Sequence, residues 1–135
     1  MQLEFWTRFK EHCESLESEL RLRKPYPRHW YDMRFGTSRA HISLIVDTRN
    51  EQIRCELYIP DDKDLYATLK ADQEAIEKDL SYPLEWMELP ERKASRIVAV
   101  SDQAVNEPET WTECFSWLSQ AAQAFQTVFG GRIRS

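Results

Sequence analysis

The stretch from Leu65 to Val100 constrains the fold more than any other part of the sequence. Its apolar positions predict a helix, a tight turn and two paired strands, in that order. Leu69 and Ile76 belong to the apolar stripe of the helix, while Trp86 and Val98 mark the two strands. No residue pattern in this stretch is typical of a catalytic site, so it predicts an architecture and leaves the function open.

The rest of the chain follows the same two periodicities. Apolar residues three and four apart predict helices, while alternation or a run of β-branched residues predicts strands. The predicted helices cover residues 3–22, 63–80 and 109–129, and the predicted strands cover residues 30–35, 41–47, 52–59, 84–89 and 96–100. The order α-β-β-β-α-β-β-α predicts an α+β fold of two layers, in which three helices pack on a five-stranded, mainly antiparallel sheet.

Length and cysteine usage indicate the general class of the protein. A chain of 135 residues with ordinary apolar and charged fractions fits a single domain spanning residues 1–135. No window approaches the roughly 18–20 apolar residues that cross a bilayer, and the amino terminus lacks the pattern of a secretory signal. Cys13, Cys55 and Cys114 are odd in number and lack Cys-x-x-Cys spacing, which is typical of buried thiols. We therefore expect a cytoplasmic protein with no membrane partner.

Charge is segregated along the chain. The formal net charge of −5 argues against binding nucleic acid over the whole surface. Residues 102–113 contain four acidic residues and no Lys or Arg, whereas residues 21–41 contain six Lys or Arg residues and one acid, Asp32. This segregation leaves open a local binding surface, or self-association through opposite charges.

Residues 21–41 form the strongest candidate binding segment. Its Lys and Arg side chains would neutralise phosphates, and Tyr26, His29 or Tyr31 would stack on an unpaired base. The alternative is a solvated helix end and loop whose aromatic side chains turn inward to the core. The candidate residues for binding nucleic acid or a partner are Arg21, Arg23, Lys24, Tyr26, Arg28, His29, Tyr31, Arg34 and Arg39.

The sequence predicts no catalytic constellation. A restriction-type nuclease needs an Asp on one strand and Glu-x-Lys on the next to hold a divalent metal. Asp47 and Glu56 have this separation, but Tyr58 stands where the Lys is needed. Glu56 is instead expected on the wet face of an alternating strand, paired with a neighbouring Arg. The histidines show no metal-ligand spacing, and there is no nucleophile elbow or Walker loop. We therefore expect no catalytic residue, no metal and no cofactor.

Several motifs occur in an order that resembles one known family. They are Phe5-Trp6, Trp30, Arg54–Ile59, Ala75–Lys78, Leu84-Glu85-Trp86, Ser95-Arg96-Ile97, Trp111 and Trp117. Together they resemble a bacterial and archaeal domain-of-unknown-function family, number 4268, from about Phe5 to Phe129. The resemblance implies a domain that often accompanies restriction-type nuclease domains, here as a stand-alone or excised copy. A link to DNA metabolism or phage defence follows from the resemblance alone.

Two functions are consistent with these observations. The first is a non-catalytic interaction module of a prokaryotic DNA-restriction or phage-defence system, which binds nucleic acid or a nuclease-bearing partner through the basic aromatic segment. The second is a homodimeric protein–protein interaction domain without nucleic-acid affinity. A small enzyme with an unrecognised pocket is a third candidate.

Overall fold

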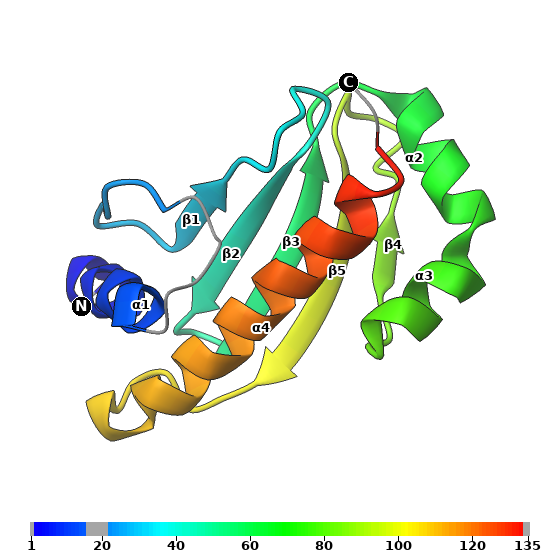
Figure 1. Ribbon diagram of the computed structural model, residues 1–135. Coiled ribbons are helices and arrows are strands. Elements are labelled where there is room, and N and C mark those ends of the chain that lie inside the picture. Colours follow the sequence, from blue (N-terminus) through cyan, green and yellow to red (C-terminus); the bar gives the residue numbers. More distant parts are fainter. Residues whose placement is uncertain (1, 16–21, 134–135) are drawn as a thin grey trace.

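A computed structural model describes residues 2–15 and 22–133 of the chain (Figure 1). In chain order the described elements are α1 (Gln2–Ser15), β1 (Trp30–Met33), β2 (His41–Asp47), β3 (Gln52–Ile59), α2 (Lys63–Ala71), α3 (Gln73–Leu80), β4 (Glu85–Met87), β5 (Ser95–Asp102), a 3-10 turn (Pro108–Thr110) and α4 (Trp111–Gly130). Among these elements, no helix is long and apolar enough to cross a membrane.

The five strands form one antiparallel sheet in the order β1-β2-β3-β5-β4. The chain leaves β3 through α2 and α3, enters the sheet again at its far edge as β4, and returns as β5 between β4 and β3. β2 and β3 pair along their whole length, and β5 pairs with all of β3. The predicted α+β class and the antiparallel sheet are confirmed.

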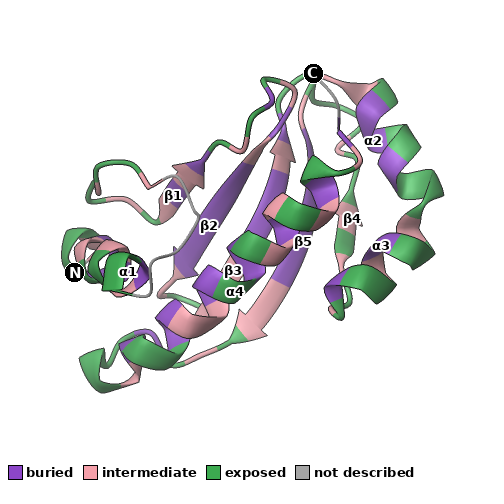
Figure 2. Cartoon of the chain, viewed as in Figure 1, coloured by how far each residue is buried: buried purple, intermediate pink, exposed green. Residues whose placement is uncertain are grey.

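The helices cover one face of this sheet. Figure 1 shows α4 lying across β2, β3 and β5, with α1 near one end of α4 and with α2 and α3 toward the β4 edge. Figure 2 shows buried residues on the side of α4 that faces the strands and exposed residues on its outer side. The predicted stripe of α4 is buried as expected: Trp111, Cys114, Phe115, Leu118, Ala122, Phe125 and Phe129. None of the described helices lies on the opposite face of the sheet.

All three predicted helices differ in extent from the structure, the last one least, because it spans Trp111–Gly130 instead of residues 109–129. The expected helix over residues 63–80 breaks at Asp72, whose backbone N–H bonds to the carbonyl of Leu69, 3.0 Å away, in a tighter turn than an α-helix makes. The break gives four described α-helices in place of the three expected. Asp is a weak helix former, and here its carboxylate accepts a hydrogen bond of 3.0 Å from Nε of Arg132 beyond α4. The expected first helix is confirmed as far as Ser15; residues 16–21 are not described, and Leu22, its expected last residue, is not helical.

Aromatic rings join α1 to the rest of the core. The ring of Phe5 lies 5.1 Å from that of Trp111, and the ring of Trp6 lies 5.4 Å from that of Tyr31 on β1. The indole Nε1 of Trp6 donates a hydrogen bond of 2.7 Å to the carbonyl of Arg28. The loop before β1 is therefore held against α1 by a buried side chain.

Lys63 fixes the hairpin between β4 and β5 to the start of α2. Its ammonium group donates hydrogen bonds to the carbonyls of Glu88, Leu89 and Ala94 and to Oγ of Ser95. The distances are 3.1 Å to the Leu89 carbonyl and 2.9 Å to the Ala94 carbonyl. The Glu88 carbonyl also accepts from Oγ of Ser95, and the Leu89 carbonyl also accepts from the N–H of Arg92. The ammonium group of Lys63 therefore adds to the hydrogen bonds that the hairpin makes by itself.

Replacing Lys63 with Met removes the ammonium group and keeps an unbranched side chain. We expect the free energy of unfolding to fall by roughly 1–3 kcal/mol, because the hairpin loses its hydrogen bonds to the ammonium group. Urea denaturation followed by tryptophan fluorescence measures the difference. Lys78→Met, on an exposed position of α3, is the matched control. An equal effect of the two substitutions would contradict the role assigned to Lys63.

Candidate functional site

The loop before β1 carries cations and an aromatic ring at the surface, which we call the basic strip: the exposed Arg23, Lys24 and Tyr26 and the half-buried Arg28. The guanidinium of Arg28 lies 4.6 Å from the ring centroid of Tyr26 and 5.0 Å from that of Trp30. The ammonium of Lys24 lies 6.0 Å from the Tyr26 ring, which is 44 % exposed. These separations lie in the range of cation–π contacts, so the cations and the rings of the strip are stacked together at the surface.

The backbone of the strip is anchored on both sides. The N–H of Arg28 donates to the carbonyl of Tyr26 at 2.9 Å, and the N–H of Val46 donates to the carbonyl of His29 at 2.8 Å. The hydroxyl of Tyr31 donates to the carbonyl of Arg23. The strip is therefore attached to β2 and to the core.

Tyr31 is buried, whereas a side chain that stacks on a base must be exposed. Only 3 % of its surface is exposed, because residue 31 points to the helix-covered face of β1 and packs on Trp6 and Phe9. This part of the sequence interpretation is corrected: among the tyrosines of the segment, Tyr26 is exposed and Tyr31 belongs to the core.

The remaining predicted residues are distributed over different surfaces. His29 is exposed beside the strip, with its ring 4.8 Å from that of Trp30. Arg34 is exposed just after β1. Arg39 is half-buried and its Nε donates to Asp62 at 2.8 Å, at the start of α2, so it ties a loop to a helix. Arg21 lies outside the described residues.

The helix-free face of the sheet is hollowed beside the strip. This open hollow has a volume of about 420 Å³, within the range of small-molecule sites. It is lined by His29, Trp30, Asp32, His41, Ser43, Ile45, Arg54, Glu56, Tyr58 and Arg96. All of these except His29 come from β1, β2, β3 and β5, and their strand register brings them to one face.

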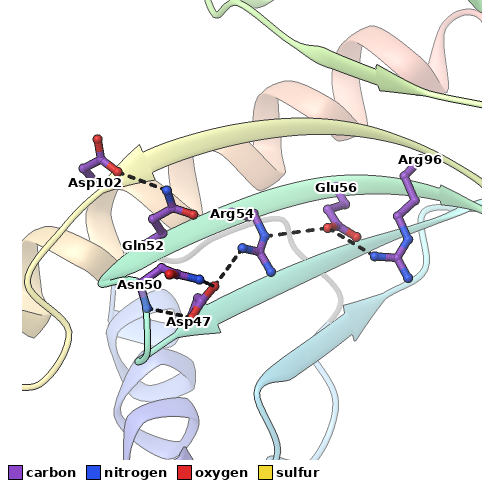
Figure 3. Close-up of polar contacts among 7 residues, drawn as sticks. All are labelled: Asp47, Asn50, Gln52, Arg54, Glu56, Arg96 and Asp102. Atoms are coloured by element: carbon purple, nitrogen blue, oxygen red, sulfur yellow. Dashed lines mark hydrogen bonds and ion pairs between the residues drawn. The ribbon is translucent and has the colours of Figure 1, made fainter.

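Glu56 lies at the centre of the hollow, and only 4 % of its surface is exposed. Its Oε1 lies 3.8 Å from Nε of Arg54 and 3.9 Å from Nη1 of Arg96 (Figure 3). Both separations exceed a normal hydrogen-bond length. Burial raises the pKa of the Glu56 carboxyl, and the charges of Arg96 and Arg54 oppose that shift without cancelling it. The carboxylate is therefore poorly solvated and keeps acceptor capacity.

Asp32 and His41 form the side of the hollow toward β1. Asp32 accepts a hydrogen bond of 2.8 Å from Oγ of Ser43, and Nε2 of His41 lies 3.7 Å from its other oxygen. Burial lowers the pKa of His41 despite the opposing charge of Asp32, so the imidazole is neutral near pH 7. The ring of Tyr58 lies 5.1 Å from that of His41 and 5.5 Å from the guanidinium of Arg96. His41, Tyr58 and Arg96 thus form a row of contacts along one end of the hollow.

Asp47 is separate from Glu56. It accepts hydrogen bonds from Asn50 and from Nη1 of Arg54 at 3.1 Å, and these contacts, those of Asn50 first, lower its pKa to about 2. Glu56 pairs in the sheet with Ser43, which lies four residues before Asp47 on β2. The Cα atoms of the two residues are therefore roughly 13 Å apart along the strand direction, and the guanidinium of Arg54 lies between their carboxylates. They cannot share one metal ion, and the described residues contain no cluster of three metal-ligating side chains.

The cysteines are core residues, as expected. Cys13, Cys55 and Cys114 are fully buried and unpaired. Burial raises the pKa of the Cys13 and Cys114 thiols to about 11. These thiols therefore stay protonated near neutral pH and are poor nucleophiles.

Nearly the whole chain matches one known protein family. A family model for a domain of unknown function (DUF4268) matches residues 1–133. The chain belongs to this family. The resemblance seen in the sequence is thereby confirmed. A comparison of the sequence with curated proteins finds no match.

The solved structures that resemble this chain have low sequence identity to it. YbjN from E. coli, a candidate transcription regulator, is 11 % identical with a TM-score of 0.52, and the match covers 90 % of this chain and 86 % of that chain. A chain of the HopA1–SchA chaperone–effector complex is 13 % identical with a TM-score of 0.41, and the match covers 87 % of this chain and 94 % of that chain. The likeness to YbjN concerns the fold alone.

The hollow was not among the sites predicted from the sequence. The alternation of β3 correctly placed Arg54, Glu56 and Tyr58 on one face, and the predicted pairing of Glu56 with a neighbouring Arg is confirmed. The expectation that Glu56 faces water was wrong, because only 4 % of its surface is exposed. The missing information was the neighbour of β3, because Arg96 of β5 pairs with Tyr58 only after the chain has crossed α2 and α3. Charged residues alternating on two non-consecutive strands are the signal that could have indicated the site.

A Glu56→Gln substitution tests how much the buried charge of Glu56 lowers the free energy of unfolding. As pH rises above the ordinary Glu value of 4.5, the unfolded chain loses the Glu56 proton before the folded chain does. The free energy of unfolding of the wild type should therefore fall relative to that of the variant between pH 4.5 and neutrality. Urea denaturation at several pH values measures this difference, and Glu85→Gln, exposed on β4, is the control. If the free energy of unfolding of the wild type instead rose relative to that of Glu56→Gln as pH increased, the attraction of the arginines for the carboxylate would exceed the cost of burying it.

Proposed function

We propose that this domain is a non-catalytic module that binds single-stranded nucleic acid through the basic strip. The observation that carries the proposal is the stack in which the half-buried Arg28 guanidinium contacts the rings of both the exposed Tyr26 and the half-buried Trp30. Single strands are commonly bound by cations that follow the phosphates and by aromatic rings on which bases stack. Each stacked base contributes about 1–3 kcal/mol. The strip offers both kinds of contact.

The surroundings of the strip support this proposal. His29 is exposed next to it, and Arg54, which is paired with Asp47, lies in the hollow beyond Trp30. The protein as a whole is acidic, with a net charge of −5. A local cationic surface on an acidic protein favours binding at one place instead of over the whole surface.

The resemblance to family 4268 supports a biological setting for this module. In our proposal it acts in the cytoplasm, in a prokaryotic DNA-restriction or phage-defence system, beside a nuclease-bearing protein. The nucleic acid would then be the ligand shared by the module and its partner.

Neutralising the strip should weaken binding in a salt-dependent way. We expect wild-type protein to bind labelled single-stranded DNA at low salt and to lose affinity steeply as salt increases. The variant with Arg23→Ala, Lys24→Ala and Arg28→Ala together should bind more weakly, and its log–log salt slope should be smaller by roughly 2, at about 0.7 for each phosphate that is no longer neutralised. Fluorescence anisotropy at low and physiological salt measures both quantities. Duplex DNA should bind less well, because its bases are not free to stack on Tyr26.

The matched control neutralises three exposed cations elsewhere. Lys78 lies on α3, and Arg92 and Lys93 lie in the turn between β4 and β5. Changing these three to Ala alters the net charge by the same amount and should leave the salt slope unchanged. An equal decrease of affinity in both triple variants, or no binding by the wild type, would contradict the proposed function.

A homodimer without nucleic-acid affinity is the second candidate function. It is favoured by the charge segregation, because the acids of residues 102–113 are exposed in the structure: Asp102, Glu107, Glu109 and Glu113. In a symmetric pair, the acidic segment of one copy would meet the basic strip of the other.

Mass measurements separate this candidate from the first. If the opposite charges hold two copies together, light scattering should show a dimer at low salt that dissociates as salt screens the contact. The triple variant at Arg23, Lys24 and Arg28 should then be a monomer. A wild-type monomer at every salt concentration would exclude such a dimer.

A further inference from the structure

We propose that the hollow on the helix-free face binds one guanine base of the strand held by the basic strip. This inference rests on the proposed function and adds base recognition to it. The hollow and the strip are continuous, because Trp30 lines the hollow and also contacts the guanidinium of Arg28 at 5.0 Å. A strand that follows the strip toward the sheet therefore reaches the hollow next.

The floor of the hollow alternates between donors and acceptors. Figure 3 shows the Glu56 carboxylate between the guanidinium groups of Arg54 and Arg96. At 3.8 and 3.9 Å these ion pairs are too long to be hydrogen bonds. Nε of Arg96 is buried and finds no hydrogen-bond partner among the described residues. The row thus places a carboxylate with acceptor capacity beside the half-exposed side chain of Arg96, whose Nη1 makes no hydrogen bond to that carboxylate.

Guanine is the base whose polar edges match this row. Its N1–H and N2–H₂ groups are adjacent donors, which suit the two oxygens of a carboxylate, and its O6 and N7 are adjacent acceptors, which suit a guanidinium. Adenine and cytosine present a single amino donor on the corresponding edge, and thymine presents a single N–H. Only guanine uses both Glu56 and an arginine beside it in a bidentate way.

Glu56 is the acceptor available in the hollow. Asp32 also lines it, but this carboxylate already accepts a hydrogen bond from Ser43 and lies near His41. Asp47 at the end of β2 is occupied by Asn50 and Arg54. Glu56 receives no comparable hydrogen bond from a described side chain, so a ligand supplies the donors it lacks.

Aromatic rings flank the hollow on two sides. Trp30 lies at the end nearer the strip, and Tyr58 with His41 lies at the other end. The imidazole of His41 is neutral near pH 7 because burial lowers its pKa. These rings offer apolar contact to the faces of a planar base, while the polar row addresses its edge.

The test uses oligothymidine of about 12 nucleotides, a length in the range that single-strand-binding folds cover. Four probes carry guanine, hypoxanthine, 7-deazaguanine or adenine at one central position. Hypoxanthine lacks the N2 amino donors and 7-deazaguanine lacks the N7 acceptor. We expect wild-type protein to bind the guanine probe roughly tenfold more tightly than the hypoxanthine or adenine probe, as measured by anisotropy. The affinity for the 7-deazaguanine probe should lie between the affinity for the guanine probe and that for the hypoxanthine probe.

Variants assign the preference to its residues. Glu56→Gln should bind the guanine and hypoxanthine probes with equal affinity. Arg96→Lys should bind the guanine and 7-deazaguanine probes with equal affinity. Glu85→Gln, exposed on the same face, should keep both ratios. Circular dichroism verifies that each variant is folded, and the wild-type ratios test the inference even if a variant is not.

The outcomes separate the two proposals. Equal binding of all four probes by the wild type, or an unchanged ratio in folded Glu56→Gln, overturns guanine recognition and leaves the binding function of the strip intact. A uniform loss of affinity in Glu56→Gln without a change of ratio also overturns it. Absence of binding to every probe overturns the proposed function, and guanine recognition with it.

Discussion

The described helices cover only one face of the sheet, and this constraint determines the chemistry of the other face. On β3 the residues that point to the helices are buried and apolar, as at Ile53, Leu57 and Ile59. The intervening side chains lie on the uncovered face, where the strand register brings together charged groups from β2, β3 and β5. Because none of the described helices lies there to exclude water or supply partners, those groups contact one another. The resulting polar network is open to a ligand.

The position of the basic strip depends on the aromatic core. The loop before β1 contains no helix or strand among its described residues. The buried indole of Trp6 donates a hydrogen bond to the Arg28 carbonyl, and the hydroxyl of Tyr31 donates one to the Arg23 carbonyl. These bonds replace those that a helix or strand would provide. The side chains of Tyr26 and Arg28 can therefore point outward from a fixed backbone. A surface so anchored loses less conformational entropy on binding than a free loop would.

The sequence predicted those features that depend on local periodicity. β2 and β3 have the predicted bounds, because alternation and β-branched residues mark both of their ends. It did not predict the break at Asp72, since the apolar stripe continues through it from Leu69 to Ile76. It could not choose between the inward and outward orientation of Tyr31, because that choice depends on which face α1 covers. The hollow was missed for the same reason, since Arg96 lies beside Tyr58 only through non-local strand pairing.

The arrangement around Glu56 is difficult to explain by stability alone. A buried carboxylate between two guanidinium groups gains Coulomb energy, but desolvation often exceeds that gain, and apolar side chains of similar volume are often as stable or more stable. Here the raised pKa of Glu56 indicates that desolvation is the larger effect, and its ion pairs are longer than hydrogen bonds. A ligand that donates hydrogen bonds to the carboxylate would remove part of this cost. The same geometry that destabilises the free protein would then favour the bound one.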